Sequence, residues 1–187
     1  MSEQSIARMA ANLRQFIKFG MVGGSGALVN FAVFVLCKKI AEDFFHVHET
    51  DVWFPILGTE FNVRWYNVFM VIAFLVANTW NYQLNRMWTF KSVNSVSWLR
   101  GFFPFLLTGL GALVVSQIFM VLLMNPTTPI GLPREIFDDS TGLRTMSYWA
   151  NMISVILAMP VNFMINKLWT FRSRPEGPRV VHEQEPA

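Results

Sequence analysis

Four long stretches without Asp, Glu, Lys or Arg constrain this chain more than any other feature. They cover residues 19–37, 65–85, 101–124 and 145–166. A helix needs about 20 mostly apolar residues to cross a hydrocarbon core roughly 30 Å thick. Because a helix satisfies its own backbone hydrogen bonds, each stretch can cross a membrane. We therefore predict an all-α integral membrane protein with four transmembrane helices, at about residues 17–40, 65–88, 101–124 and 145–169.

The composition excludes the main alternatives. Only 14% of the residues are charged and 53% are hydrophobic, whereas an average soluble domain has about 25% charged residues. Soluble helices of this length show a polar, usually charged face, and these stretches contain no charged residue. A disulfide scaffold is excluded because Cys37 is the single cysteine. The first stretch exceeds the usual signal-peptide core of about 7–15 residues, so we expect it to be retained.

The charges predict the orientation of the helices. Ten of the fifteen basic residues lie in the two tails and the loop at 86–100, while eight of the twelve acidic residues lie in the loops at 38–64 and 125–144. Positive residues accumulate on the cytoplasmic side. We expect a cytoplasmic tail over residues 1–15, a transmembrane domain over 16–173 and a flexible cytoplasmic tail over 174–187. The net charge of +3 then reflects topology, and nucleic-acid binding is not expected.

The sequence also contains an internal repeat. NYQLNRMWTFKS at 81–92 matches NFMINKLWTFRS at 162–173, and Gly-Ala-Leu-Val occurs at both 26–29 and 111–114. Each copy contains two predicted spans, so both copies cross the membrane in the same direction. This arrangement is a parallel repeat of two helix pairs, related by an axis along the membrane normal.

The repeat places amide side chains at equivalent positions of the second and fourth spans. Residues three or four positions apart share a helix face, which gives one stripe of Asn78, Asn81 and Asn85 and another of Asn162 and Asn166. Amides in a bilayer need hydrogen-bond partners, so we expect both stripes to face the bundle. They can join helices or bind a polar substrate, and the sequence leaves both roles open.

Cations and tryptophans follow the two stripes. Arg86 and Lys167 lie where a lipid phosphate would lie, with Lys18 at the start of the first span. Such cations either anchor a helix in the interface or pair with a phosphate. Trp88 and Trp169 lie at the ends of the second and fourth spans, where interfacial tryptophans are common.

Other polar residues suggest a path through the membrane but no catalysis. Asn30 and Gln117 lie deeper in the first and third spans and are candidates for this path. None of the four stretches contains a carboxylate for proton exchange, and no nucleotide-binding loop is found. His46 and His48 form only a weak metal-binding pattern. We expect no catalytic residue, no metal site and no cofactor.

These features resemble the GtrA-like family of small four-span membrane proteins. The resemblance rests on the repeated helix pair, on F-x-K-F at 16–19 and on N-x-x-N-[RK]-x-W-x-F at the end of each pair, and it covers residues 16–173. It implies a non-enzymatic flippase of the bacterial inner membrane for polyprenyl-phosphate-linked sugars, such as undecaprenyl-phosphate-glucose. That lipid-linked sugar transport serves polysaccharide biosynthesis, including O-antigen modification, and a partner membrane glycosyltransferase makes the sugar lipid.

The resemblance places Arg86 and Lys167 on the family's basic positions and the two asparagine stripes on its amide positions. The second copy departs from the first, because Met159 occupies the position of Asn78 and Val161 that of Trp80. The alternative function is a non-transporting membrane subunit that organises the glycosyltransferase, and an exporter of small solutes comes third. A homodimer is compatible with the sequence.

Overall fold

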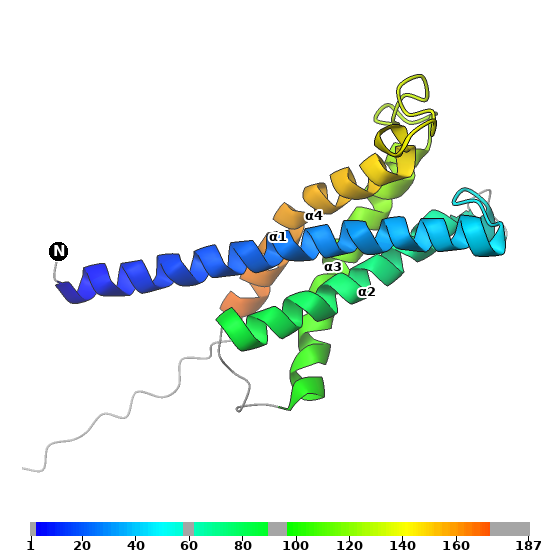
Figure 1. Ribbon diagram of the computed structural model, residues 1–187. Helices are drawn as coiled ribbons and strands as arrows, with labels where there is room; N and C mark the ends of the chain where they lie inside the picture. Colours follow the sequence, from blue (N-terminus) through cyan, green and yellow to red (C-terminus); the bar gives the residue numbers. More distant parts are fainter. Residues whose placement is uncertain (1–2, 58–61, 90–96, 173–187) are drawn as a thin grey trace, which may run out of the picture.

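The computed structural model describes the backbone of residues 3–57, 62–89 and 97–172, and the side chains of residues 20–57, 62–88 and 97–160. Within these ranges the chain forms four α-helices (Figure 1), namely α1 (Glu3–Phe45), α2 (Trp65–Leu84), α3 (Trp98–Met124) and α4 (Met146–Arg172). A π-helical turn, η1 (Asn85–Thr89), continues α2, and a short 3₁₀ turn, η2 (Gly142–Arg144), precedes α4. The helices occupy the ranges of the four predicted spans.

Two features differ from the sequence prediction. The strands β1 (Val52–Pro55) and β2 (Asn62–Arg64) pair as an antiparallel hairpin between α1 and α2, so the chain is mostly rather than wholly helical. In addition, α1 starts at Glu3 and continues to Phe45, past both expected ends. No glycine or proline interrupts residues 3–19 or 27–45, so nothing local stops the helix.

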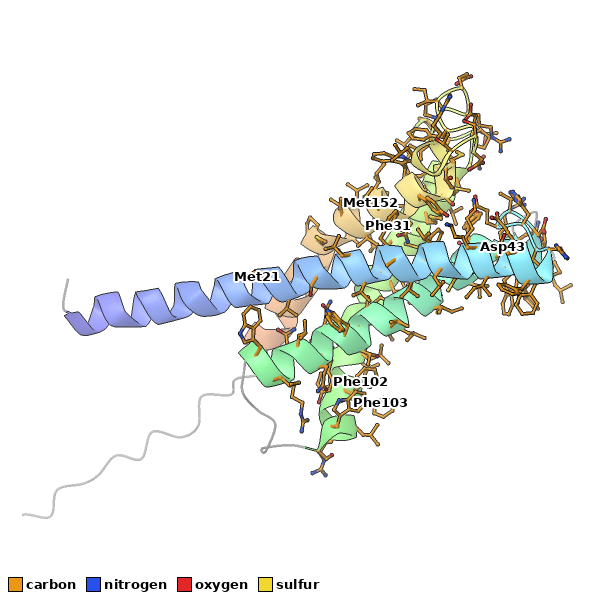
Figure 2. All side chains as sticks on the ribbon, viewed as in Figure 1. Met21, Phe31, Asp43, Phe102, Phe103 and Met152 are labelled. Carbon is orange, nitrogen blue, oxygen red and sulfur yellow. The ribbon has the colours of Figure 1, made fainter. Side chains whose placement is uncertain are left out.

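The helices pack as two antiparallel pairs, which correspond to the two copies of the repeat. α1 has its main contacts with α2, and α3 with α4, while contacts between the pairs are fewer. Figure 1 shows the α1–α2 pair crossing the α3–α4 pair. At the contact between α1 and α4, the rings of Phe31 and Tyr148 lie edge to face with centroids 5.8 Å apart. Figure 2 shows Phe31 and Met152 near this crossing.

The surface of the bundle is more apolar than that of a soluble protein. Large apolar side chains are exposed along every helix, including Leu28, Val76, Leu107 and Ile156. Buried positions, in contrast, include amides and hydroxyls, among them Asn30, Asn78, Asn85, Ser116 and Asn151. Soluble monomers rarely expose apolar patches larger than a few hundred Å². The exposed surface therefore suits lipid rather than water.

Two helices in the described residues are long and apolar enough to cross a membrane, Gly20–Phe45 and Trp98–Met124. α2 is less apolar because it carries three asparagines, and the described side chains of α4 end at Pro160. The crossing of the membrane by all four helices therefore stays a prediction.

The apolar core lies in the half of the bundle nearest the hairpin. Phe34, Phe69, Met70 and Met120 fill it, and the small side chain of Ala73 lets the helices approach closely. The rings of Phe34 and Phe69 meet edge to face with centroids 6.2 Å apart. Toward the other half, amides take the place of these apolar side chains.

An ion pair and hydrogen bonds of Arg144 stabilise the connection between α3 and α4. Arg144 pairs with Asp138 at 3.0 Å and donates to the carbonyls of Glu135 and Ile136. Hydrogen bonds from the hydroxyl and the amide of Ser140, followed by the charge of Arg144, lower the pKa of Asp138. The Asp138 carboxylate therefore stays ionised to a lower pH than usual, which preserves this ion pair in mild acid.

Candidate functional site

The stripe of Asn78 and Asn81 in α2 and Asn85 in η1 lies between α1 and α3. Asn78 and Asn85 are buried, with exposed fractions of 8% and 4%, and Asn81 is partly buried. A Cβ atom on Gly26 of α1 would lie 2.2 Å from Asn81 Oδ1, and one on Gly109 of α3 would lie 2.9 Å from Asn78 Oδ1. The two glycines thus leave room for the amides of the neighbouring helix.

Several of these amides have unused hydrogen-bonding atoms. Within the described residues, buried Asn30 Oδ1, Asn78 Nδ2, Asn81 Oδ1 and Asn85 Oδ1 have no hydrogen-bond partner. Buried polar atoms are normally paired, and an unpaired one costs about 1–3 kcal/mol. The stripe therefore offers donors and acceptors to water or to a polar ligand, beyond any role in joining helices.

Arg86 follows the stripe, at the point where α2 continues as the π-helical turn η1. Arg86 lies in η1, and π-helical turns of this kind occur frequently at functional sites. Arg86 Nη1 donates to the hydroxyl of Tyr82 at 3.1 Å, and this hydroxyl donates to the carbonyl of Trp98 at 2.9 Å. The first residue of α3 is thereby connected to the guanidinium group.

Aromatic rings surround Tyr82 at the start of α3. Trp98 stacks on Phe102 with ring centroids 4.7 Å apart, and both rings lie edge to face with Tyr82. Figure 2 shows Phe102 and Phe103 at this end of α3. Gly101 also allows the close approach, because its Cβ would lie 2.3 Å from the Tyr82 oxygen.

We predict that Tyr82→Phe weakens the link between η1 and α3 without changing the fold. A net hydrogen bond contributes about 1 kcal/mol, and in a chain of this size that lowers the melting temperature by about 2–4 °C. Differential scanning fluorimetry in detergent measures the change. Phe105→Leu is the control, because the centroid of the Phe105 ring lies 5.5 Å from that of Tyr82 and this ring carries no hydroxyl. An unchanged melting temperature for Tyr82→Phe would show that the two hydrogen bonds do not stabilise the fold.

The other predicted site residues differ in burial and in position. Asn30 is buried, with an exposed fraction of 6%, whereas Trp88 is 40% exposed. Gln117 lies away from the stripe, level with Asn67, and its Nε2 donates to the Asn67 carbonyl at 2.9 Å. Five further predicted residues have side chains outside the described part: Lys18, Asn162, Asn166, Lys167 and Trp169.

Gln117 and Asn67 line a cavity of about 650 Å³ between the hairpin, α2 and α3. Its other walls are mainly apolar and include Trp53, Val71 and Val121. An apolar cavity on the lipid-facing side of the bundle suits a hydrocarbon chain.

The sequence analysis missed a buried charge cluster at the hairpin end. Lys38 of α1 lies 2.8 Å from the Glu49 carboxylate, and Ser147 of α4 donates to the same carboxylate oxygen at 2.5 Å. Glu49 and Ser147 are 98 residues apart, so no local spacing pointed to this contact. The described residues contain no group of three or more His, Cys, Asp or Glu side chains suited to a metal ion.

The comparison with protein families supplies an independent observation. A family model described as GtrA/DPMS, transmembrane domain, matches residues 18–132 and 136–183. The chain belongs to this family. GtrA/DPMS membership and the apolar exterior of the helices assign the protein to a membrane, and the resemblance drawn from the sequence is confirmed. No curated protein and no solved structure matches the chain significantly.

Proposed function

We propose that this protein flips a polyprenyl-phosphate-linked sugar from the cytoplasmic to the periplasmic leaflet of a bacterial inner membrane. The GtrA/DPMS domain family is associated with membrane flipping of sugar lipids. The observation that carries the proposal is the stripe of amides that ends at Arg86, several atoms of which have no hydrogen-bond partner among the described residues. A cation can pair with the phosphate of such a headgroup, and amides can donate to and accept from its sugar hydroxyls.

In this proposal each part of the substrate meets a matching surface. The phosphate pairs with Arg86, and Lys167, which is the counterpart of Arg86 in the repeat, and Lys18 are further candidate cations. The sugar hydroxyls exchange water for the amides of Asn78, Asn81 and Asn85. The polyprenyl chain stays in lipid along the apolar exterior. The protein then acts as a non-enzymatic facilitator, and net movement follows the gradient of the sugar lipid.

A transport assay tests this function directly. Purified full-length protein in liposomes is given a radiolabelled polyprenyl-phosphate sugar in one leaflet, and its arrival in the other leaflet is timed. We expect faster transfer than in protein-free liposomes. Equal rates would reject flipping and favour the non-transporting subunit, for which the extension of α1 to Glu3 supplies a helical segment outside the bundle (Figure 1).

The orientation makes a separate prediction that cysteine labelling can check. In a Cys37→Ala background, Ser140→Cys lies in the 125–144 connection and Ser5→Cys in the N-terminal segment. A membrane-impermeant maleimide should label Ser140→Cys in spheroplasts with an intact inner membrane, and Ser5→Cys only after lysis. The opposite pattern would show that the predicted topology is wrong and that Arg86 lies on the periplasmic side.

A further inference from the structure

The cluster of Lys38, Glu49 and Ser147 is a buried ion pair at the end of the bundle opposite Arg86. The Lys38 side chain is 7% exposed and the Glu49 side chain 1%. The 20 residues of α2, which separate this end from η1, correspond to about 30 Å of helix. The cluster therefore lies about one hydrocarbon thickness from the site proposed above.

The cation and its counterion come from structurally different segments. Lys38 is held within α1, where its Nζ lies 5.4 Å from the centroid of the Tyr148 ring and 3.6 Å from Glu42. Glu49 lies in the turn between α1 and β1, and its backbone carbonyl accepts from the amide of Tyr66. The carboxylate that neutralises Lys38 thus belongs to the connection between α1 and β1 rather than to a helix of the bundle.

A polar face of α4 continues from this cluster toward the middle of the bundle. Asn151 lies one turn after Ser147, and both side chains are fully buried. Neither Asn151 Oδ1 nor Asn151 Nδ2 has a hydrogen-bond partner among the described residues. Ser154 follows on the same face, also fully buried, and donates to the Asn151 carbonyl at 2.9 Å. The ion pair therefore lies near an amide whose donor and acceptor have no partner among the described residues.

We propose that Lys38, Ser147 and Asn151 form a second binding site for a phosphate group, which Glu49 occupies in the present structure. One Glu49 oxygen accepts from both Lys38 and Ser147, and a phosphate oxygen accepts the same donors. A phosphodiester and a carboxylate each carry one negative charge, so their exchange leaves the charge of the site unchanged. This inference rests on the proposed function in assigning the phosphate to the substrate as it leaves toward the second leaflet.

Binding, rather than transport, tests this site. The full-length protein is studied in detergent in an Arg86→Ala background, which weakens the first site by removing one of its cations. The probes are inorganic phosphate and a short-chain isoprenyl monophosphate, and binding is measured by phosphorus NMR line broadening and by the shift in melting temperature. Inorganic phosphate reports a free-phosphate site, whereas a response to the isoprenyl phosphate alone reports a lipid headgroup.

Glu49→Gln is the decisive variant because it removes the competing anion while keeping the shape of the side chain. Removal of a resident competitor raises the competent fraction of the site, and we expect binding of at least one probe to tighten about tenfold. Lys38→Gln should abolish this gain, and the exposed neighbour Lys39→Gln should leave it intact. A merely structural ion pair would not produce tighter binding, so equal affinities before and after Glu49→Gln would overturn the proposal.

A second variant keeps the test valid if Glu49→Gln fails to fold. Asn151→Leu removes an unpaired amide, so its melting temperature should not fall, and probe binding should weaken severalfold. Unchanged binding would overturn the proposal. The transport assay is kept separate. Flipping by the wild type without any effect of Glu49→Gln on binding rejects this site alone, whereas tighter binding without wild-type flipping rejects the proposed function alone.

Discussion

Gly26→Leu is expected to lower the melting temperature of the detergent-solubilised protein by about 2–12 °C. Even a Cβ atom at this position would lie 2.2 Å from Asn81 Oδ1 and 2.5 Å from Asn81 Cγ. A leucine must therefore displace the Asn81 amide and separate α1 from α2. Overpacking of this kind costs about 1–3 kcal/mol, and each kcal/mol lowers the melting temperature by about 2–4 °C in a chain of this size.

The same helix provides a matched control for this prediction. A Cβ atom on Gly23 has nothing within 4 Å, and Gly23 is exposed. Gly23→Leu should therefore melt close to the wild type. The milder pair Gly26→Ala and Asn81→Ala forms a double-mutant cycle, in which the second change should restore part of the stability lost in the first. Equal melting temperatures for Gly26→Leu and Gly23→Leu would show that α1 and α2 do not meet at this glycine.

Arg86→Ala is expected to slow transport of the sugar lipid by about 10–100-fold in the liposome assay. The reason is the loss of a charge-assisted hydrogen bond to the lipid phosphate, worth about 1.5–3 kcal/mol, and each 1.4 kcal/mol corresponds to a factor of ten. Arg86→Lys keeps the charge but loses the planar, forked geometry, so it should recover only part of the rate.

Arg100 supplies the control for charge at the same end of the bundle. It lies in the first turn of α3 and is exposed, and Arg100→Ala should transport at nearly the wild-type rate. Fluorimetry of each variant separates loss of transport from loss of fold. If Arg86→Ala folds and transports normally, Arg86 is only an interfacial anchor, and the phosphate is bound elsewhere.

Much of the fold follows from the sequence because the lipid environment permits few structures. Uncharged stretches of about 20 residues have to form helices in lipid. The motif repeated at 81–92 and 162–173 defines two helix pairs. The hairpin at 52–64 was not predicted, because it pairs two short strands across a loop without a strong turn motif. The helix α1 continues past Lys38 and Lys39, which had indicated a loop, because burial beside Glu49 lets Lys38 remain in the helix.

The candidate site was only partly predictable, because some of its contacts depend on how the connections between the helices fold. Helical spacing alone puts Asn78, Asn81 and Asn85 on one face, and the structure places them between α1 and α3. The contact of Glu49 with Ser147 depends on how a connection folds over the end of another helix pair, and no periodicity encodes that arrangement. Likewise, the hydrogen bond from Tyr82 to the Trp98 carbonyl depends on where α3 starts, which the intervening loop decides.

The crossing of the two helix pairs has a consequence for the lipids around the protein. The apolar segments Gly20–Phe45 and Trp98–Met124 contain 26 and 27 residues, or about 40 Å of helix, whereas the hydrocarbon core measures about 30 Å. Helices longer than the core tilt to match it. Because the pairs cross (Figure 1), a change in bilayer thickness has to change the angle between them and thereby the spacing of the amides at their contact. The protein should therefore respond to acyl-chain length in a reconstituted membrane, with an optimum at the thickness that its native tilt requires.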